Sequence, residues 1–527
     1  YLKYHVVIIH GTLLLENNQI MKNEYKKRID NANVYEAAIR TPLEKQINLS
    51  KRFNNNILLK REDLQPVFSF KIRGAYNKMK NLSDENLKNG VIACSAGNHA
   101  QGVALAAKIL ECNATIVMPK TTPFIKINAV ESHGAKVILH GETLHECFDH
   151  ALGIQKKQGS IFVHPFDDPE VIAGQGTIAK EILDDYSRPI DAIFCCVGGG
   201  GLISGIAAYI KAVKPEIKII GVEAEGADAM TQSLKANKRV TLEKISMFAE
   251  GAALKQVGEL PFKICQQYVD EMIVVSKDEI CAAIKDVFED TRTILEPAGA
   301  LAVAGIKSYI KKNNVESKTF VATASGANMN FDRLGFVSER AEIGEEREAI
   351  FAVTIPEKPG AFKTFCSLIG ENNITEFNYR YSSENSANIF VGISVKNFDE
   401  AKSIFEVLKR ASLEPIDLTH NTMAKLHLRH LVGGHAPEAK NEVIYRFQFP
   451  EKPGALLNFL EKMGHWNISL FHYRNHGSDI GRVLVGMQVD EESKEESKEF
   501  LKNLGYTYVN ETNNEAYKIF LGKTHEN

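Results

Sequence analysis

The chain contains 527 residues, more than one hydrophobic core usually holds, so two to four domains are expected. Its charges nearly cancel, with 63 Lys and Arg against 66 Asp and Glu, and it has no long basic run. This balance argues against nucleic acid or an anionic membrane as the main partner. The sequence also lacks an uninterrupted apolar stretch of about 18 residues, so no membrane span is expected.

The eight cysteines are scattered, and Cys195 and Cys196 lie in an apolar run typical of a buried strand. This pattern favours reduced thiols and a cytoplasmic location. Segment 1–33 is an N-terminal extension of unknown role. Within it, Val6–Leu15 is interrupted by His10 and lacks the features of a secretory signal, and the polar content of Glu16–Asp30 predicts loose structure.

Residues 34–335 alternate short apolar runs with longer helical stretches, which predicts a domain of α/β class with parallel sheets covered on both faces. So many strands are more than one small sheet needs, and two lobes with a cleft between them are expected. Ligands in such folds bind at the carboxyl ends of the strands. The expected strands are Val91–Ser95, Ala114–Met118, Lys136–Leu139, Ile161–Val163, Asp191–Val197, Lys218–Val222, Met272–Val275 and Thr319–Thr323.

An acidic stretch marks residues 336–347 as a neck, and an internal repeat follows it. The hexapeptide PEKPGA occurs at Pro356–Ala361 and again at Pro450–Ala455, an offset of 94 residues. Further positions recur at the same offset, which chance would not produce. They pair Phe365 with Phe459, Gly370 with Gly464, Asn373 with Asn467, Ile374 with Ile468, Phe377 with Phe471, Tyr379 with Tyr473, Arg380 with Arg474, Val391 with Val485 and Gly392 with Gly486.

Each copy of the repeat reads as a strand, a Pro-Gly turn, a helix, two further strands and a second helix. This order is typical of a ferredoxin-like module of α+β class. The two modules are expected over residues 348–425 and 440–522.

Lys71 is the first candidate for chemistry, within the run SFKIRGA at Ser69–Ala75. A lysine beside Phe70 at the start of a helix can be partly desolvated and lie near the positive end of a helix dipole. Both effects lower the pKa of an amine and make it a nucleophile. Taken alone, Lys71 also fits an ordinary solvated lysine.

Three further motifs follow predicted strands. SAGNHAQG at Ser95–Gly102 opens a helix, where backbone N–H groups can receive a carboxylate. The four glycines Gly198–Gly201 lie between an apolar strand and a helix, which favours a phosphate cup. SGAN at Ser325–Asn328 offers a hydroxyl at a strand end. Each motif by itself also fits a helix cap or a tight turn.

The order SFKIRGA, SAGNHAQG, GGGGL, EPAGA and SGAN, over about Arg40 to Asn328, resembles the fold type II pyridoxal phosphate (PLP) enzymes. These enzymes have the tryptophan synthase β-like fold. Within them, the motifs are similar to those of threonine and serine dehydratases. The resemblance implies PLP as the cofactor and a two-lobed catalytic domain over residues 34–335.

The resemblance also implies roles for individual residues. Lys71, preceded by Phe70, would form the Schiff base with PLP, and Asn98 would meet its phenolic oxygen. Ser325 would meet the pyridine nitrogen. The phosphate would be held by Gly198, Gly199, Gly200, Gly201 and Leu202, and the substrate carboxylate would be surrounded by Ser95, Gly97, Asn98 and His99.

The doubled PEKPGA modules resemble the paired ACT-like regulatory domains of biosynthetic threonine dehydratases. This implies conversion of L-threonine to 2-oxobutanoate and ammonia, the first step of isoleucine biosynthesis, in a homotetramer. Isoleucine is the expected feedback inhibitor and valine a second candidate effector. The expected effector residues are Tyr379, Arg380, Tyr473 and Arg474, where tyrosine would cover the side chain and arginine would face the carboxylate. These residues fit a packed tyrosine followed by a solvated arginine equally well.

Two other interpretations of the sequence remain open. A serine dehydratase or serine racemase shares the same fold, and an amino-acid sensor with a defunct catalytic domain would keep the tail. Serine racemases hold a divalent ion after the strand that here reads Gly221–Ala229. Glu223 is present, but Ala229 stands where a second acid is expected, so no metal is predicted.

Overall fold

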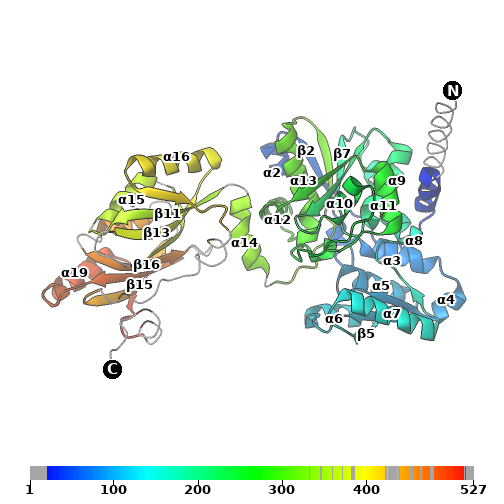
Figure 1. Ribbon diagram of the computed structural model, residues 1–527, viewed down its shortest axis with the longest axis horizontal. Helices are drawn as coiled ribbons and strands as arrows, with labels where there is room; N and C mark the ends of the chain where they lie inside the picture. The colour runs from blue at the N-terminus through cyan, green and yellow to red at the C-terminus, as the bar shows by residue number, and fades with distance from the viewer. Residues whose placement is uncertain are drawn as a thin grey trace. The chain divides into compact units, whose positions relative to one another are not determined.

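The computed structural model describes residues 21–331, 333–344, 347–358, 360–370, 372–380, 386–421, 424, 436, 439–450, 455–462, 466–474, 480–514, 517 and 521. The chain divides into two compact units, Tyr1–Ala341 and Glu342–Asn527 (Figure 1). The boundary falls within helix α14 (Arg333–Gly344), which makes up most of the stretch expected as a neck.

The larger lobe of the first unit is built on a six-stranded sheet with the order β1-β2-β10-β7-β8-β9. Its strands are parallel except β1, which pairs antiparallel with β2. Most of its residues are buried, as expected for a sheet covered by helices on both faces. The strands are β1 Leu43–Lys45, β2 Asn56–Lys60, β7 Ala192–Cys196, β8 Lys218–Ala224, β9 Glu271–Val275 and β10 Thr319–Thr323.

The smaller lobe is built on a four-stranded parallel sheet with the order β5-β4-β3-β6. Its strands are β3 Val91–Cys94, β4 Ala114–Met118, β5 Lys136–Leu139 and β6 Ile161–Phe162. The first unit also contains the 3₁₀ turns η1 Glu62–Leu64 and η2 Glu250–Ala252. Its helices from residue 47 up to α14 are α2 Ile47–Arg52, α3 Lys71–Lys80, α4 Asp84–Lys88, α5 Asn98–Ile109, α6 Phe124–Glu131, α7 Leu144–Gln158, α8 Pro169–Asp185, α9 Gly201–Val213, α10 Ala229–Ala236, α11 Glu259–Tyr268, α12 Lys277–Thr291 and α13 Pro297–Asn313.

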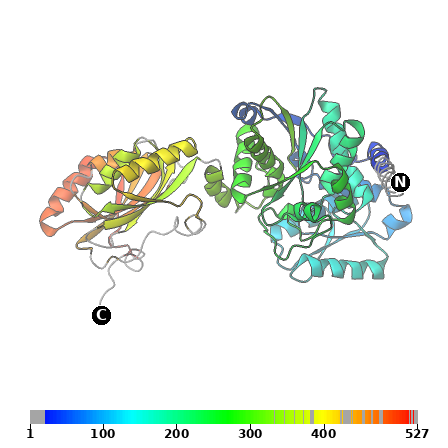
Figure 2. The ribbon, with the colours of Figure 1, turned by 45° about the horizontal axis from the view of Figure 1, so that its top comes forward.

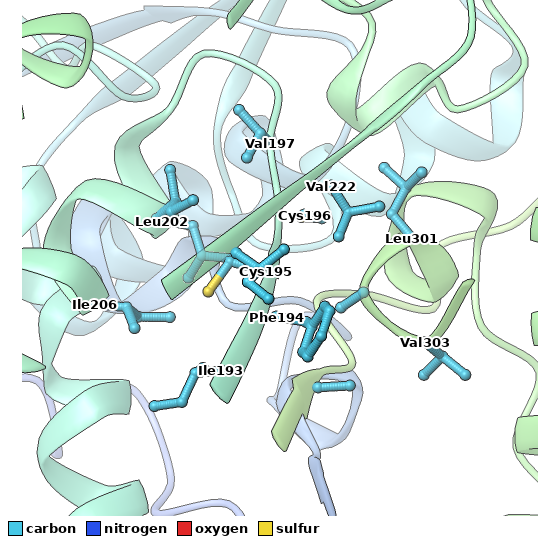
Figure 3. Close-up of a cluster of buried hydrophobic side chains, with 14 of the residues drawn as sticks. Ile193, Phe194, Cys195, Cys196, Val197, Leu202, Ile206, Val222, Leu301 and Val303 are labelled. Atoms are coloured by element: carbon cyan, nitrogen blue, oxygen red, sulfur yellow. The ribbon is translucent and has the colours of Figure 1, made fainter. Parts of the chain in front are cut away.

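The core of the larger lobe lies around β7, whose residues are all buried. Figure 3 shows Leu202 and Ile206 of α9 on one side of this strand and Leu301 and Val303 of α13 on the other. Covering both faces of β7 holds its carboxyl end, and the glycine loop that follows it, in a fixed place.

The second unit contains two modules that share one eight-stranded sheet with the order β14-β11-β13-β12-β16-β17-β15-β18. The helices lie together over one face of this sheet (Figure 2). The first module comprises β11 Glu348–Pro356, α15 Ala361–Ile369, β12 Ile374–Arg380, β13 Ser386–Ser394, α16 Phe398–Arg410 and β14 Glu414–Asp417. The second comprises β15 Glu442–Pro450, α18 Ala455–Lys462, β16 Asn467–Arg474, β17 Ile480–Gln488, η4 Glu491–Ser493, α19 Lys494–Leu504 and β18 Tyr508–Asn510.

The predicted fold class is confirmed, with differences in detail. Strands β1 and β2 of the first unit were not predicted, nor were the short last strands β14 and β18 of the two modules. The loose structure expected over Glu16–Asp30 is wrong for residues 21–30, which form a helix. Tyr25 and Ile29 of this helix are buried in the core of the larger lobe, which stabilises the helix despite its polar sequence. Residues 1–20 lie outside the described part of the chain.

A fully buried ion network fixes the start of α3. The guanidinium of Arg73 donates to Glu62 at 2.7 and 2.8 Å and to Glu181 at 2.6 and 3.0 Å. The Lys60 amine donates to the second oxygen of Glu181 at 2.6 Å. The four side chains have no solvent exposure, and they join β2, η1, α3 and α8. Because Arg73 lies two residues after Lys71, this network positions the candidate catalytic lysine.

Arg73→Leu should reduce the free energy of unfolding of the first unit by about 3–5 kcal/mol, because it leaves Glu62 and Glu181 buried without their main counter-charge. Urea unfolding followed by circular dichroism measures the loss. The matched control is Arg40→Leu, which removes an exposed ion pair with Asp185 and should cost at most about 1 kcal/mol. Equal losses in the two variants would contradict the role given to the network.

Candidate functional site

The two lobes of the first unit together line a cavity of about 500 Å³. All the residues predicted from the motifs for catalysis, cofactor binding and substrate binding line it, although they come from distant parts of the chain. They are Phe70, Lys71, Ser95, Gly97, Asn98, His99, Gly198, Gly199, Gly200, Gly201, Leu202 and Ser325.

Lys71 is the first residue of α3, and its amine reaches into the space between the lobes. Its Nζ donates a hydrogen bond to the backbone oxygen of Pro165 at 2.8 Å and lies 5.2 Å from the centre of the Phe70 ring. Burial lowers the pKa of Lys71 to about 8, although Cys196 and Glu296 act in the opposite direction. A substantial fraction of this amine is therefore neutral near physiological pH.

The glycine loop follows β7 and opens α9. Gly200 has a φ of +94°, a region that favours glycine, and a Cβ built on it would lie 2.7 Å from Cβ of Pro261. A Cβ on Gly198 would lie 2.8 Å from the backbone of Ala252, and one on Gly199 would lie 2.2 Å from the Phe166 ring. Only glycine fits these positions, and the N–H groups at the start of α9 suit an anion.

Ser325 ends the segment after β10 and is buried. Its hydroxyl donates to the backbone oxygen of Ala298 at 3.3 Å and accepts from the thiol of Cys196 at 3.2 Å. Burial raises the pKa of that thiol to about 11, with Ser325 and Lys71 acting to lower it. The thiol is therefore neutral, and Ser325 offers an uncharged hydrogen-bond partner on this wall of the cavity.

The segment after β3 forms another wall. The Ser95 hydroxyl accepts from the Gly97 N–H at 3.3 Å, and a Cβ on Gly97 would meet no atom within 4 Å. The His99 ring bonds through Nε2 to the backbone oxygen of Val163 at 2.8 Å. Burial lowers the pKa of His99 to about 3, and the nearby charge of Lys71 acts in the same direction. The ring is therefore neutral, and Nε2 carries its proton because it faces a carbonyl oxygen.

Two residues of this site, Glu296 and Asn328, were not predicted. Asn98, the first residue of α5, donates through Nδ2 to Oε1 of Glu296 at 2.6 Å and accepts at Oδ1 from Asn328 at 2.7 Å. Burial raises the pKa of Glu296 to about 7, with the hydrogen bond from Asn98 acting in the opposite direction. Glu296 lies in the motif EPAGA and Asn328 in the motif SGAN. Both motifs were identified from the sequence, but no role was predicted for these two residues.

The predicted effector residues lie on β12 and β16, which pair antiparallel in the second unit. The side chains of Tyr379 and Tyr473 are buried, and the Tyr379 hydroxyl donates to the Glu357 carboxylate at 2.6 Å. The backbones of Arg380 and Arg474 end the same strands, but their side chains lie outside the described part of the structure.

Glu223, considered above as a metal ligand, is engaged within the protein. Its buried carboxylate accepts from the N–H groups of Met230 and Thr231 and from the Thr231 hydroxyl, at 2.8, 2.8 and 2.6 Å. Among the described residues, no cluster of three or more His, Cys, Asp or Glu side chains could hold a metal ion.

In the same part of the chain, no helix has the length and apolar character needed to cross a membrane.

Comparison of the sequence with known proteins identifies the family of the chain. The profile of pyridoxal-phosphate dependent enzymes matches residues 34–326, and that of the C-terminal regulatory domain of threonine dehydratase matches residues 339–428 and 433–521. The L-threonine dehydratase biosynthetic IlvA of Burkholderia multivorans is 54% identical over 503 residues, which cover 95% of this chain and 99% of that protein. The chain belongs to the biosynthetic threonine dehydratase family.

Other members of this family are similarly close. The biosynthetic enzyme of Escherichia coli is 48% identical over 501 residues, covering 94% of this chain and 97% of that protein. The processed form of threonine deaminase isoform 2 from Solanum lycopersicum superposes with a TM-score of 0.60 at 50% identity, covering 61% of this chain and 88% of that chain. Maize serine racemase is also similar, at 33% identity and a TM-score of 0.56, covering 60% of this chain and 95% of that chain. The catalytic fold is therefore shared with racemases, whereas the regulatory profile is that of threonine dehydratase.

The cavity of this threonine dehydratase family member fits PLP. The loop Gly198–Gly201 lines the cavity and cannot accept a Cβ at three of its positions, and it leads into the N-terminus of α9, where N–H groups suit a phosphate. One buried polar atom of the cavity lining, Nδ1 of His99, has no hydrogen-bond partner among the described residues, as expected where a polar ligand completes a site. Lys71 and Ser325 would offer such a cofactor a desolvated amine and an uncharged hydroxyl on the walls of the cavity.

The pKa of Lys71 leads to a pH prediction. The rate at which PLP attaches covalently to the apoprotein should rise with pH through about 8, because only the neutral amine attacks the aldehyde. At pH 7.5 roughly a quarter of a group with this pKa is neutral, against about 0.1% for an ordinary lysine. Stopped-flow absorbance between pH 6 and 10 measures the rate, with Lys71→Ala as the blank. A rate that rises only near the pKa of a solvated lysine would contradict the desolvation of Lys71.

Proposed function

We propose that this chain converts L-threonine to 2-oxobutanoate and ammonia, as the first step of isoleucine biosynthesis. The main support is the 54% identity to a biosynthetic L-threonine dehydratase over 95% of the chain, which includes both the catalytic and the regulatory parts. The desolvated amine of Lys71 in a cavity suited to PLP supports a working catalytic site, which argues against a sensor with a defunct enzyme domain.

In this proposal the residues of the cavity divide the chemistry among them. Lys71 takes the proton from Cα of the substrate, and its lowered pKa suits that task. PLP, when bound, supplies the conjugated ring over which the negative charge at Cα spreads. The N–H groups of Gly198–Gly201 would hold its phosphate, and Ser325 would meet its ring nitrogen through an uncharged hydroxyl. A neutral partner there limits the lifetime of the charge at Cα and favours loss of the β-hydroxyl over transamination.

We assign the substrate carboxylate to the segment that opens α5. The Ser95 hydroxyl, the open space beside Gly97 and the N–H groups of the first turn of α5 suit an anion at a helix N-terminus. Neutral His99 and the amide of Asn98 complete this wall without adding a negative charge. The β-hydroxyl leaves as water, which leaves an enamine, and protonation of its β-carbon converts it to an imine. Hydrolysis of the imine gives 2-oxobutanoate and ammonia, so the net reaction neither consumes nor releases water.

Lys71→Ala should abolish formation of 2-oxobutanoate from L-threonine, because no other amine of the cavity occupies this position. The control is Lys80→Ala on the same helix, whose exposed amine pairs with Glu36 and lies outside the cavity lining. A spectrophotometric assay of 2-oxobutanoate measures both variants. Near-normal turnover by Lys71→Ala would overturn the assignment of the catalytic lysine.

The same assay with L-serine separates the related functions. A pocket that accepts the extra methyl group gains about 1–3 kcal/mol, which corresponds to a preference for threonine of about 10-fold to 200-fold. A preference for serine, or D-serine as the main product, would assign the chain to the serine dehydratases or racemases that share the fold.

We further propose that isoleucine inhibits the enzyme through the second unit, with valine as an opposing effector. Support comes from the regulatory profile over residues 339–428 and 433–521 and from the repeated Tyr-Arg pairs at 379–380 and 473–474. Because β12 and β16 are neighbours in one sheet, a ligand at one strand can change the packing of the other. Inhibition requires that isoleucine bind a less active state more tightly than the active one.

Tyr379→Ala should raise the isoleucine concentration for half-inhibition about tenfold or more, with a smaller loss of basal rate, because the ring that covers the effector side chain is removed. The control is Tyr508→Ala on the edge strand β18 of the same sheet. Initial rates over a series of isoleucine concentrations measure the effect. Unchanged sensitivity in Tyr379→Ala, and in Tyr473→Ala, would exclude these residues as the effector site.

We propose a cytoplasmic homotetramer as the working form. All eight cysteines are unpaired and seven are buried, which suits a reducing compartment. We also propose the division into an extension at 1–33, a catalytic domain at 34–335, a neck at 336–347 and regulatory domains at 348–425 and 440–522. Light scattering of the purified protein tests the tetramer.

A further inference from the structure

The amide of Asn98 is held from both sides by residues of the larger lobe. Its Oδ1 accepts from Nδ2 of Asn328 at 2.7 Å, and its own Nδ2 donates to Oε1 of Glu296 at 2.6 Å. Asn98 opens α5 beside the smaller sheet, whereas Asn328 follows β10 and Glu296 precedes α13 in the larger lobe. The amide therefore bridges the two lobes at the cavity.

The orientation of the Asn98 amide follows from its neighbours. Asn328 also donates through Nδ2 to the backbone oxygen of Val67 at 2.8 Å, so its two N–H bonds face two acceptors. The oxygen of Asn98 must then lie toward Asn328 and its nitrogen toward the Glu296 carboxyl. The hydrogen bond to Glu296 uses one of the two hydrogens on Nδ2 and leaves the second for a group in the cavity.

The packing around Glu296 keeps its carboxyl in place. A Cβ on Gly326 would lie 2.6 Å from Oε1 of Glu296, and one on Gly251 would lie 3.3 Å from the same atom. The backbone N–H of Glu296 donates to the oxygen of Gly326 at 3.1 Å. Gly326 and Gly251 thus leave just enough room for the carboxyl of Glu296, which has little freedom to move.

We propose that Glu296 and Asn328 are positioning residues that lock the amide of Asn98 in one orientation, so that one of its N–H bonds is kept for the phenolic oxygen of PLP. The proposal rests on the proposed PLP chemistry and on the role that the family resemblance implies for Asn98, contact with the phenolic oxygen of PLP. It gives a purpose to the polar residues of EPAGA and SGAN, which lie 198 and 230 residues from Asn98. An N–H donor at the phenolic oxygen favours its ionised form.

Asn328→Asp is the sharpest test, because it replaces a donor by an acceptor at nearly the same shape. The carboxylate would repel the oxygens of Asn98 and Val67 and favour the opposite orientation of the Asn98 amide. We expect the dissociation constant of PLP, from fluorescence titration of the apoprotein, to rise about tenfold. The pH at which the visible absorbance of bound PLP changes should move upward, because the phenolic oxygen loses its donor.

Glu296 supplies a second, independent pair of variants. Glu296→Gln keeps an oxygen that can accept from Asn98, and should change the affinity for PLP less than about twofold. Glu296→Ala removes the acceptor and should shift both affinity and absorbance in the same direction as Asn328→Asp. If Asn328→Asp does not fold, as judged by circular dichroism, the comparison of Gln with Ala at position 296 decides the proposal.

The control for the charge change is Asn313→Asp at the exposed end of α13, which should leave both readouts unchanged. A double-mutant cycle tests whether Asn328 acts through Asn98: in the Asn98→Ala background, Asn328→Asp should have no further effect. An undiminished effect in that background, or equal behaviour of Asn328→Asp and Asn313→Asp, would overturn the proposal. Neither readout depends on threonine turnover. If the wild type makes no 2-oxobutanoate and the variants still follow this pattern, the clamp stands and the proposed function fails.

Discussion

The buried guanidinium of Arg73 is the interaction on which the site depends. It lies between two carboxylates, Glu62 and Glu181, and each belongs to a different element. A charge without solvent exposure is tolerated only when every hydrogen bond is made, so these elements cannot shift relative to one another without a large energetic cost. The start of α3 is thereby held against η1 and α8. Lys71 begins that helix, so the position of its amine is fixed by a network outside the cavity.

Desolvation then determines the chemistry inside the cavity. The same burial that lowers the pKa of Lys71 to about 8 raises that of Glu296 to about 7 and keeps His99 neutral. Burial thus favours the neutral forms of these three side chains. The groups that can stabilise a bound anion are instead the backbone N–H groups at the starts of α5 and α9. Such donors are already oriented and need little reorganisation when a negative group arrives. This arrangement suits a reaction in which an anionic substrate and an anionic cofactor meet beside a neutral amine.

The sequence predicts the parts of the site that are local, and misses those that depend on distant contacts. Lys71, Gly198–Gly201 and Ser325 could be predicted as candidates because each lies in a motif at the end of an apolar strand or the start of a helix, and all of them line the cavity. Glu296 and Asn328 could not be given a role, because only the meeting of the two lobes brings them to Asn98. The repeat predicted two modules but not their union in one sheet. Strands β12 and β16 are edges of equivalent modules, and nothing in their patterns specifies that they pair.

The central claim is that Lys71, held by the Arg73 network in a desolvated cavity, is the amine that bonds to PLP. Reduction of the PLP-loaded protein with borohydride converts the C=N bond to a stable secondary amine, and mass spectrometry of its peptides then identifies the labelled lysine. The account predicts one pyridoxyl group per chain, on the peptide that contains Lys71. A label on another lysine, or label spread over several surface lysines, would contradict it.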